Sequence, residues 1–350
     1  MVAKLMSLNQ ILNKHLKFKS YVYKINCTIH IFYPATLIPY RDEPPNPTTF
    51  LPSYKNNTEN VQFVIHTKAI FTFFIEKVLN NMMVKSITSP SNPLIKKIAS
   101  LNDKSKLRKE TQSFVIEGKK EIMMAIRGGY KPSVMLFNPV IVRYNQLFDL
   151  YGEILFSTEM IEVTNLVYNK LAYRETTEGV MAIFKQRNTD LQDLTWTSDT
   201  PLLIVAESPE KPGNIGALLR TADAAGVDAV IIANPTTDIF NPNIIRSSVG
   251  TLFTLQIATG TTDEVIHFLK SKKLQTICAT LTDSAVSCYK MNFNQPTAIV
   301  VGTESSGLSE TWIKAADYNV VIPMQGQVDS MNVSVSAAIL LFEAVRQRNH

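Results

Sequence analysis

The chain has 350 residues, more than one typical domain needs, which suggests two domains and an additional segment. Hydrophobic residues make up 45% and charged residues 19% of it, a composition that predicts a packed core and excludes a largely disordered chain. The three cysteines form no CxxC pair and the five histidines are isolated, so we predict neither a disulfide framework nor a metal site.

Residues 1–83 differ from the rest, being rich in Asn, Lys and aromatic residues without a helix or strand period. Their most apolar stretch, 61–79, contains charged residues and fails the test for a membrane span, and no signal-peptide pattern is present. Regular patterning begins just after Met82 and Met83. We therefore expect a cytoplasmic protein without a membrane segment, and hypothesise that residues 1–83 are an extension upstream of the native start.

The pattern of residues 84–185 predicts a small α/β domain with an excess of basic residues. Helical spacing or strand-like runs cover 93–101, 114–116, 118–127, 133–137 and 179–184. Between Lys85 and Lys131 there are eleven basic residues and four acidic ones. Such an excess suits RNA phosphates, although a solvated basic face explains the charge equally well. The expected RNA contacts are Lys104, Lys106, Arg108 and Lys109.

Residues 186–200 are polar and aperiodic, which predicts a linker to a second domain at 201–350. In that domain, apolar runs of strand length alternate with helical segments. The runs are 202–206, 228–232, 274–279, 297–302 and 319–324. Uninterrupted apolar strands between helices indicate a mainly parallel sheet that is covered on both faces. Ligands of such sheets bind at the carboxyl ends of the strands.

Three loops at those strand ends hold the unusual residues. The first, 207–227, leads into a helix with Asn214 near its start and Arg220 among apolar neighbours. Asn214 is explained equally by helix capping and Arg220 by a surface charge, yet an arginine on so apolar a helix usually has an anionic partner. The second loop, 300–310, has Gly302 and Gly307 on either side of Glu304, which permits close approach of the backbone to a ligand or simply a tight turn.

The third loop, 322–332, leads into a long helix with an apolar stripe. Ser330 and Asn332 precede that helix, and the alternative interpretation is that they only cap it. Taken together, NIGALLRTADAAGV, VVGTESSGLSE and IPMQGQVDSMNVSVSAA, with RSSVG at 246–250, closely resemble the SpoU (TrmH-like) family of the SPOUT superfamily. Residues 84–185, with FVIEGKKEI and TTEGVMAIF, are similar to the substrate-binding domain that often precedes it.

The resemblance implies an α/β fold with a deep C-terminal trefoil knot, a homodimer, and S-adenosylmethionine-dependent methylation of a ribose 2′-hydroxyl in structured RNA. It assigns cofactor contacts to Gly302, Ile322 and Met331, where Met331 replaces a common leucine. The implied catalytic arginine is Arg220, placed by Asn214, Glu304, Ser330 and Asn332. Since a guanidinium is almost never neutral, we expect this arginine to hold the adjacent phosphate, which leaves the proton acceptor open. Arg246 is expected to contact a phosphate, with a surface charge as the alternative.

Two rival functions are weighed against this one. A Rossmann or P-loop enzyme is disfavoured because the chain contains neither GxGxxG nor GxxxxGK[ST]. An RNA-binding protein of the same fold without catalysis is disfavoured because Arg220, Ser330 and Asn332 are all present. Among RNAs, large-subunit ribosomal RNA is expected over transfer RNA, by analogy with relatives that carry the extra N-terminal domain.

Overall fold

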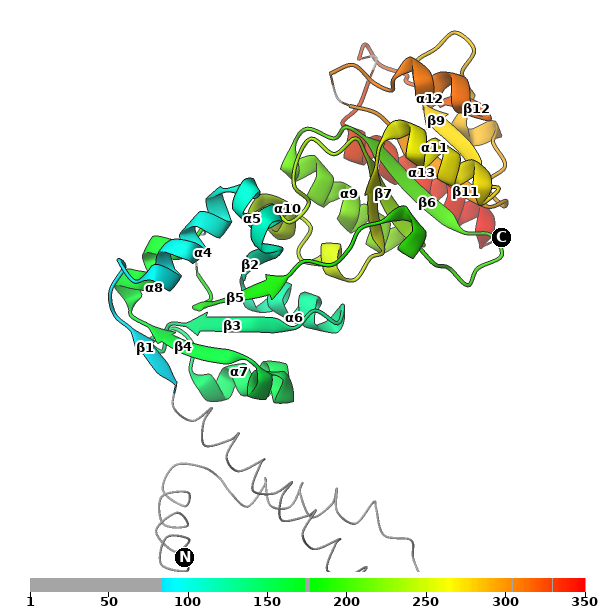
Figure 1. Cartoon of the computed structure of the whole chain (residues 1–350). Helices are drawn as coiled ribbons and strands as arrows, with labels where there is room; N and C mark the ends of the chain where they lie inside the picture. Colours follow the sequence, from blue (N-terminus) through cyan, green and yellow to red (C-terminus); the bar gives the residue numbers. More distant parts are fainter. Residues whose placement is uncertain (1–83, 174–176, 304, 329, 350) are drawn as a thin grey trace, which may run out of the picture. The chain divides into compact units, whose positions relative to one another are not determined.

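The computed structural model describes residues 84–173, 177–303, 305–328 and 330–349 (Figure 1). The expected extension 1–83, with Met82 and Met83, lies outside the described residues, and so does Glu304. In the part of the chain that is described, no helix is both long and apolar enough to cross a membrane.

The N-terminal domain is built on a five-stranded sheet in the order β1-β4-β3-β5-β2. Its elements are β1 (Lys85–Ile87), α4 (Pro93–Asp103), α5 (Ser105–Thr111), β2 (Ser113–Glu117), α6 (Lys119–Arg127), β3 (Pro132–Phe137), α7 (Tyr144–Tyr151), β4 (Glu159–Val163), α8 (Asn165–Leu171) and β5 (Val180–Lys185). Strand β5 runs antiparallel to β2 and β3, and the other pairs are parallel. The predicted helices and strands of this domain are confirmed within a few residues, whereas β1, β4, α5, α7 and α8 were not predicted.

The capping residues explain where helices of this domain begin. The Asn92 side chain accepts a hydrogen bond from the Leu94 backbone N–H, and Pro93 takes the first helical position, where it loses no hydrogen bond. Helix α4 then buries Ile95, Ile98 and Leu101 at helical spacing. The domain therefore forms from local signals and an amphipathic pattern.

The expected linker 186–200 differs from a free connection. It contains a short 3-10 helix, Leu191–Asp193, and it buries Leu191 and Leu194 in the same apolar cluster as Leu203 and Val205. Two leucines in a polar segment explain the difference, because each can bury its side chain against the sheet while its polar neighbours remain in water.

The C-terminal domain carries a seven-stranded sheet in the order β10-β12-β9-β11-β6-β7-β8, and all its described pairs are parallel. Its strands are β6 (Leu202–Glu207), β7 (Ala229–Ala233), β8 (Ile257–Gly260), β9 (Gln275–Ala279), β10 (Val286–Ser287), β11 (Thr297–Val301) and β12 (Tyr318–Val321). Its helices are α9 (Pro212–Ala225), α10 (Pro242–Ser247), α11 (Thr262–Ser271), α12 (Glu310–Ala315) and α13 (Val333–Arg348). The predicted strands are confirmed, and β8 and β10 are additional.

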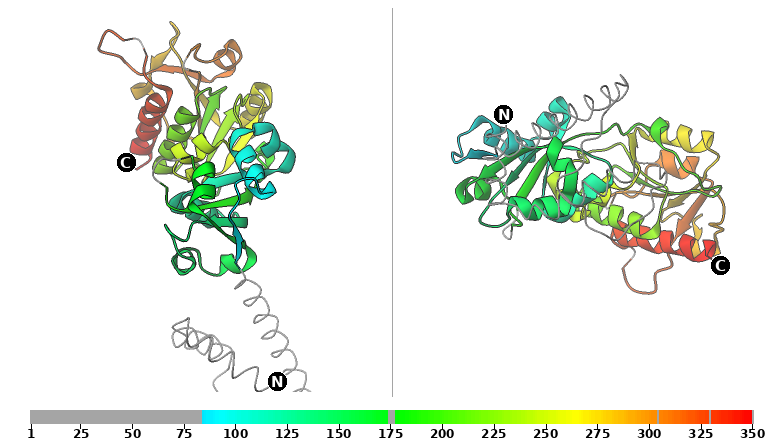
Figure 2. Two further views of the ribbon diagram at one scale, coloured as in Figure 1. Left: turned by 90° about the vertical axis from the view of Figure 1, so that its left-hand side faces the viewer. Right: turned by 90° about the horizontal axis from the view of Figure 1, so that it is seen from below.

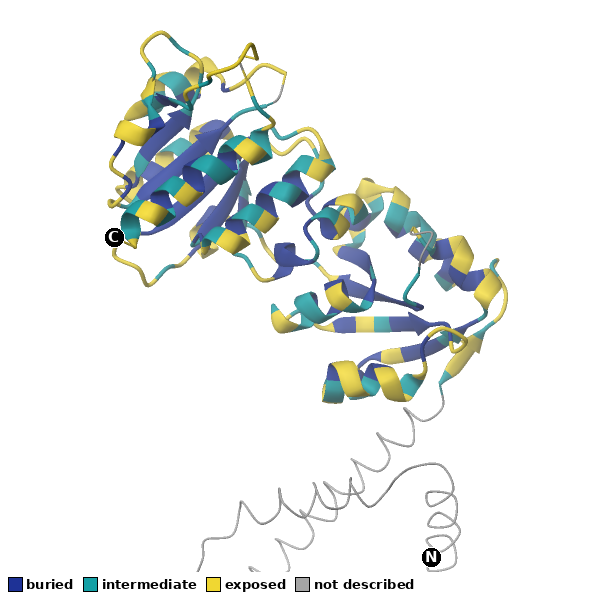
Figure 3. Cartoon of the chain, turned by 180° about the vertical axis from the view of Figure 1, so that it is seen from behind, coloured by how far each residue is buried: buried dark blue, intermediate teal, exposed yellow. Residues whose placement is uncertain are grey.

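Both faces of this sheet are buried, as the uninterrupted apolar strands predict. Leu202 and Ile204 of β6 pack in one cluster with α9 and α13, while Leu203 and Val205 pack in another with α11 and α12. Figure 2 shows α13 and α11 on opposite sides of the sheet, and Figure 3 shows the strands as almost entirely buried. The mainly parallel α/β fold expected from the sequence is therefore confirmed.

The two domains share one apolar core. A single cluster of buried residues includes Phe114 and Phe184 of the N-terminal domain together with Phe240 and Phe253 of the C-terminal domain. The Phe114 ring stacks on Phe240 at 4.6 Å and on Phe253 at 5.6 Å between ring centroids. The segment from 238 to 253, which contains α10, thus belongs to both domains.

Candidate active site

The candidate site lies where β6, β11 and β12 end. Strands β6 and β11 are paired, and β9 connects β11 to β12, all in parallel, so the carboxyl ends of these strands meet at one edge of the sheet. The three loops picked out from the sequence follow these ends. The fold therefore brings together segments that lie more than a hundred residues apart in the chain.

Asn214 and Asn332 meet at this edge. Asn214 lies in the first turn of α9, whose N-cap is Lys211, so the capping interpretation of Asn214 is wrong. The Asn332 side chain does cap α13 by accepting from the Ser334 backbone N–H, and its Nδ2 also donates to Asn214 Oδ1 at 3.2 Å. The start of the first motif's helix is thus fastened to the end of the third motif.

Arg220 and Arg246 meet in a different place. They line an open pocket of about 410 Å³ between α9 and α10. The pocket is completed by Pro212, Gly213, Asn243, Ser247 and Val249. Both arginines are exposed, and within the described residues neither guanidinium takes part in an ion pair. Guanidiniums that line one pocket are chemically suited to an anion that accepts several hydrogen bonds, such as a phosphodiester.

The six-residue interval between Asn214 and Arg220 explains why the predicted site residues form two separate groups, the two asparagines and the two arginines. Six residues advance an α-helix by about 9 Å and turn it by roughly 240°. Asn214 therefore faces the start of α13, while Arg220 faces α10. A substrate in contact with both must span this part of α9.

The second motif loop turns back on itself. Thr303 and Gly307 form an isolated antiparallel bridge, and a Cβ on Gly302 would overlap the Gly307 backbone. Gly307 has a φ of +69° and faces open space, a conformation that favours glycine. The Ser305 hydroxyl donates to Glu210 at 3.2 Å, which links this loop to the first one. Both glycines predicted to matter here are thus required by the backbone itself.

The residues expected to contact S-adenosylmethionine fit that cofactor. Ile322 packs partly buried against the core, and Met331 is half-buried, whereas Ser330 is exposed. Residues 322–328 carry no charge, and neither Gly326 nor Gly307 has an atom near the place where a Cβ would lie. Half-buried apolar side chains beside open backbone suit the adenosine part of the cofactor, which needs apolar contact and backbone hydrogen bonds.

Glu207, the last residue of β6, was not singled out from the sequence. The residue is 5% exposed, and its carboxylate accepts from the Ser309 backbone N–H at 2.8 Å, the Ser309 hydroxyl at 2.7 Å and the Thr262 hydroxyl at 3.1 Å. It thereby fixes the end of the second motif loop to β6. The signal in the sequence is an acidic residue that closes an otherwise apolar strand.

The four expected RNA contacts on α5 and beside it separate into two kinds. Lys104, Lys106 and Lys109 are exposed, as phosphate contacts must be. Arg108 is only 2% exposed, and its guanidinium is bonded to Asp238 and to two backbone carbonyls. The prediction that Arg108 contacts RNA is therefore wrong, because this side chain faces the interior.

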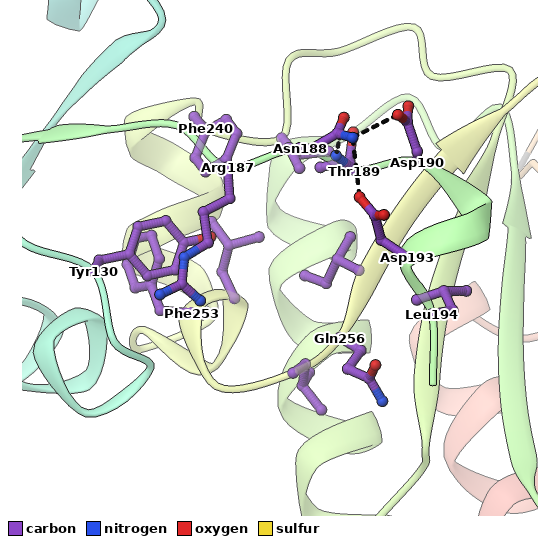
Figure 4. A pocket seen from close by; sticks show the side chains of 14 residues that line it. Tyr130, Arg187, Asn188, Thr189, Asp190, Asp193, Leu194, Phe240, Phe253 and Gln256 are labelled. Atoms are coloured by element: carbon purple, nitrogen blue, oxygen red, sulfur yellow. Dashed lines mark hydrogen bonds between the residues drawn. The ribbon is translucent and has the colours of Figure 1, made fainter. Parts of the chain in front are cut away.

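A second pocket, of about 450 Å³, lies beside the linker and is shown in Figure 4. The Arg187 guanidinium lies over the Tyr130 ring at 4.2 Å from its centroid, above Phe253. The lining residues Leu255, Gln256 and Ile257 lead into the amino end of β8. Since all strands of this sheet are parallel, the pocket lies at the edge opposite the three motif loops.

Cysteine and metal chemistry find no support among the described residues. Cys278 and Cys288 are buried, and burial, with smaller contributions from Glu207 and Asp317, raises the pKa of the Cys278 thiol to about 12. A thiol of this kind is not a nucleophile at neutral pH. No group of three His, Cys, Asp or Glu side chains in the described ranges could hold a metal ion.

Two family models match the chain. Residues 201–342 match the SpoU rRNA methylase family, and residues 92–182 match the MRM3-like substrate-binding domain. A 23S rRNA uridine 2′-O-methyltransferase of Streptomyces viridochromogenes is 31% identical over 71% of this chain and 88% of its own length. The tRNA guanosine 2′-O-methyltransferase of Escherichia coli K12 is 36% identical over 43% of this chain and 65% of its own length.

Solved structures agree. A crystal structure of an RNA 2′-O ribose methyltransferase is 38% identical and has a TM-score of 0.66, with 76% of this chain and 100% of that chain covered. The AdoMet-bound rRNA methyltransferase of Sinorhizobium meliloti is 30% identical with a TM-score of 0.68, over 75% of this chain and 98% of that one. The chain belongs to the SpoU family of S-adenosylmethionine-dependent RNA 2′-O-ribose methyltransferases, with an MRM3-like substrate-binding domain ahead of the methylase domain.

Proposed function

We propose that the methylated nucleotide lies in large-subunit ribosomal RNA. The observation that carries this proposal is the length of this chain over which each relative matches. Matches of 258 and 262 residues to two 23S rRNA methyltransferases are long enough to span both domains, whereas the match to the E. coli tRNA enzyme covers 151 residues, too few for both. The N-terminal domain is thus the part shared with ribosomal RNA enzymes, and substrate choice follows it.

Arg220 is the catalytic arginine in this proposal, and Arg246 assists it. When bound, S-adenosylmethionine supplies an electrophilic methyl group. The two guanidiniums, which line one pocket, hold a phosphate next to the target ribose and so aim the 2′-hydroxyl at that methyl group. Positioning of this kind is worth up to roughly 7–11 kcal/mol in favourable cases.

The other expected site residues have supporting roles. Asn214, Ser330 and Asn332 order the junction between α9 and α13, with Glu304 as a fourth contributor from the second loop. Gly302, Ile322 and Met331 hold the cofactor through backbone atoms and apolar contact. The Asn332–Asn214 hydrogen bond and the half-buried state of Ile322 and Met331 support these assignments. The knotted arrangement of these loops, implied by the family, is part of the proposal.

The active form is a homodimer that pairs through α13. This helix buries Ala337, Leu340, Leu341 and Ala344 against its own sheet. On another face, Val335 and Phe342 lie seven residues apart and are each 47% exposed, with Ile339 between them. A helix that is apolar on two faces needs a second partner, and a second copy of α13 presents a matching surface.

The dimer is tested by light scattering on Phe342→Glu, with Leu166→Glu as the control because Leu166 is an exposed leucine of the other domain. We expect the first variant to be monomeric and the second to keep the oligomeric state of the unaltered protein. An unaltered protein that is monomeric and fully active would contradict the proposal.

The substrate is tested by mapping 2′-O-methylated nucleotides in total RNA from cells with and without the gene. Loss of one modification in large-subunit ribosomal RNA is the expected result, and it would fit the cytoplasmic location that we propose. Loss of a transfer RNA modification instead would assign the chain to the alternative substrate.

A further inference from the structure

The strongest unexplained feature is a buried ion pair between the domains. Arg108 Nε donates to Asp238 Oδ2 at 2.6 Å, and the two side chains are 2% and 5% exposed. Arg108 Nη1 donates to the backbone carbonyls of Leu101 and Asn102 at 2.6 and 3.0 Å. One guanidinium thus joins α4 and α5 of the substrate-binding domain to a loop of the methylase domain.

Asp238 lies in the turn immediately before α10. Its other oxygen, Oδ1, accepts from the Phe240 backbone N–H at 2.9 Å, and its backbone carbonyl accepts from Asn241, the N-cap of α10. The side chain that receives Arg108 therefore also shapes the entry to α10. Arg246, the fifth residue of α10, lies little more than one helical turn from the start of that helix and lines the pocket that it shares with Arg220.

Helix α10 is also packed closely against α9. A Cβ on Gly216 would overlap the Ser247 side chain and come within 2.7 Å of the Ser247 carbonyl carbon. The Ser247 hydroxyl donates to the Pro212 carbonyl at 3.2 Å. Arg246 thus lies on a short helix that is confined between α9, which carries Arg220, and the substrate-binding domain.

Other contacts between the two domains are also close. Gly128 lies against the Phe253 backbone so tightly that a Cβ would overlap its carbonyl oxygen. Phe114 stacks on both Phe240 and Phe253. These contacts supply cohesion through apolar area, whereas the ion pair is directional, because a guanidinium with three fixed hydrogen bonds defines both distance and angle.

We propose that Arg108 and Asp238 are a positioning pair that sets α10, and with it Arg246, at a fixed place relative to the exposed lysines of α5. Lys106 and Lys109 flank Arg108 on that helix, so RNA held by these lysines meets the arginine pocket in one defined register. The inference rests on the proposed function and on the expectation from the sequence that the exposed lysines of α5 bind the same RNA as Arg220 and Arg246.

Stability alone does not account for the pair. Removing two charges from water is costly, and well-packed apolar residues often serve a fold as well as or better than a buried ion pair does. A role in positioning predicts instead that stability and methyl transfer respond differently when the pair is replaced. The experiment separates these two responses.

The first variants are Asp238→Asn and the double variant Arg108→Met with Asp238→Asn. The single change leaves a buried guanidinium without its carboxylate, while the double change removes both charges. Glu159→Gln is the control, because Lys85–Glu159 is an exposed ion pair within the substrate-binding domain, the domain of Arg108. Thermal unfolding and the affinity for S-adenosylmethionine are measured on each full-length variant.

Methyl transfer is then measured on RNA from cells that lack the gene, and on a synthetic hairpin that contains only the mapped target. We expect the double variant to recover the thermal stability lost by Asp238→Asn, yet to show a kcat about tenfold to a hundredfold lower on the long RNA. Its activity on the short hairpin and its affinity for S-adenosylmethionine should equal those of the Glu159→Gln control. Recovery of kcat together with stability would overturn the proposal, as would an equal loss on both RNAs.

A readout without RNA keeps the proposal testable if the proposed substrate is wrong. Spin labels at Lys97→Cys on α4 and Lys270→Cys on α11, in a Cys27→Ser background, report the distance between the domains, and both lysines are exposed. The remaining Cys278 and Cys288 are buried. We expect a narrow distance distribution in the parent protein and a broad one in the double variant.

Should the double variant not fold, Asp238→Glu, which keeps the charge but lengthens the side chain, is expected to shift the distribution. An unchanged distribution in the folded variants would refute the positioning role.

Discussion

The two domains use basic residues in different ways. On the substrate-binding domain, the exposed positive charges around α5 are lysines, Lys104, Lys106 and Lys109, on a solvated surface. In the methylase domain, the pocket between α9 and α10 is lined by the arginines Arg220 and Arg246. A lysine supplies a mobile point charge, whereas a guanidinium is planar and binds in a defined geometry. Charge alone is enough to hold RNA, but aiming one hydroxyl requires fixed geometry.

The largest effect is expected for Arg220, where this difference is sharpest. Arg220→Lys keeps the charge but loses the planar fork, so we expect kcat to fall at least about a hundredfold, nearly as far as for Arg220→Ala. Affinity for S-adenosylmethionine, measured by calorimetry, should stay within a factor of about two of the parent value. Arg127→Ala, an exposed arginine on α6, is the control and should keep full activity. Near-normal turnover of Arg220→Lys would show that charge is sufficient there as well.

A smaller effect, on stability, is expected at the contact between α9 and α10. Gly216→Ala places a methyl group onto Ser247 and should lower the free energy of unfolding by about 1–3 kcal/mol. Gly213→Ala, in the same helix but with open space around its Cβ, should raise it by about 0.5–1 kcal/mol. Denaturant unfolding of both variants measures the difference. Equal effects would mean that α10 yields easily and does not hold Arg246 in place.

The lysine surface should show a modest effect with a distinct dependence on salt. Replacing Lys104, Lys106 and Lys109 by Gln should weaken RNA binding and flatten the slope of log affinity against log salt by about 2–3. Each phosphate that a lysine neutralises releases counterions, so fewer counterions are released when these three contacts are lost. Lys270, Lys272 and Lys273, also exposed, provide a control triplet on the methylase domain. A slope that changes equally in both triplets would mean that the α5 surface has no special part in holding RNA.

The smallest effect, none at all, is expected from metal removal. Neither the lysine surface nor the arginine pocket includes a cluster of metal ligands, so both domains should work without one. Dialysis against a chelator should leave the methylation rate and the affinity for S-adenosylmethionine unchanged. A rate that is lost on chelation and restored by Mg²⁺ would show that RNA binding or catalysis depends on a cation.

The two domains also differ in how much of their structure could be predicted from the sequence. The strands and motif loops of the methylase domain were predicted well, because buried parallel strands are long apolar runs and the loops need particular residues such as Gly302. The sequence could not predict that Asn332 bonds to Asn214 or that Arg220 and Arg246 line one pocket. Both arrangements depend on how α9 is turned relative to α10 and α13.

In the substrate-binding domain, the sequence could not separate Arg108 from Lys109. Both belong to one basic run, and only the partner, Asp238, 130 positions later in the chain, reveals that Arg108 points inward. Strand β4 was missed because Glu159 and Glu162 lie three positions apart, so its five residues show neither an apolar run nor the period of two that is typical of a half-buried strand. Glu207 was missed because a single carboxylate at a strand end has no motif around it.

The shared aromatic core also bears on how this protein is synthesised. Phe114 emerges from the ribosome well before its stacking partner Phe240, which follows about 125 residues later, on the order of 10 s at typical translation rates. Once residue 185 has been synthesised, the substrate-binding domain has all its strands but lacks part of its apolar cover. It therefore waits as an incomplete intermediate with an aromatic surface open to chaperones or to neighbouring chains. Synonymous codons that slow translation between 185 and 240 should lengthen this exposure and lower the yield of folded enzyme.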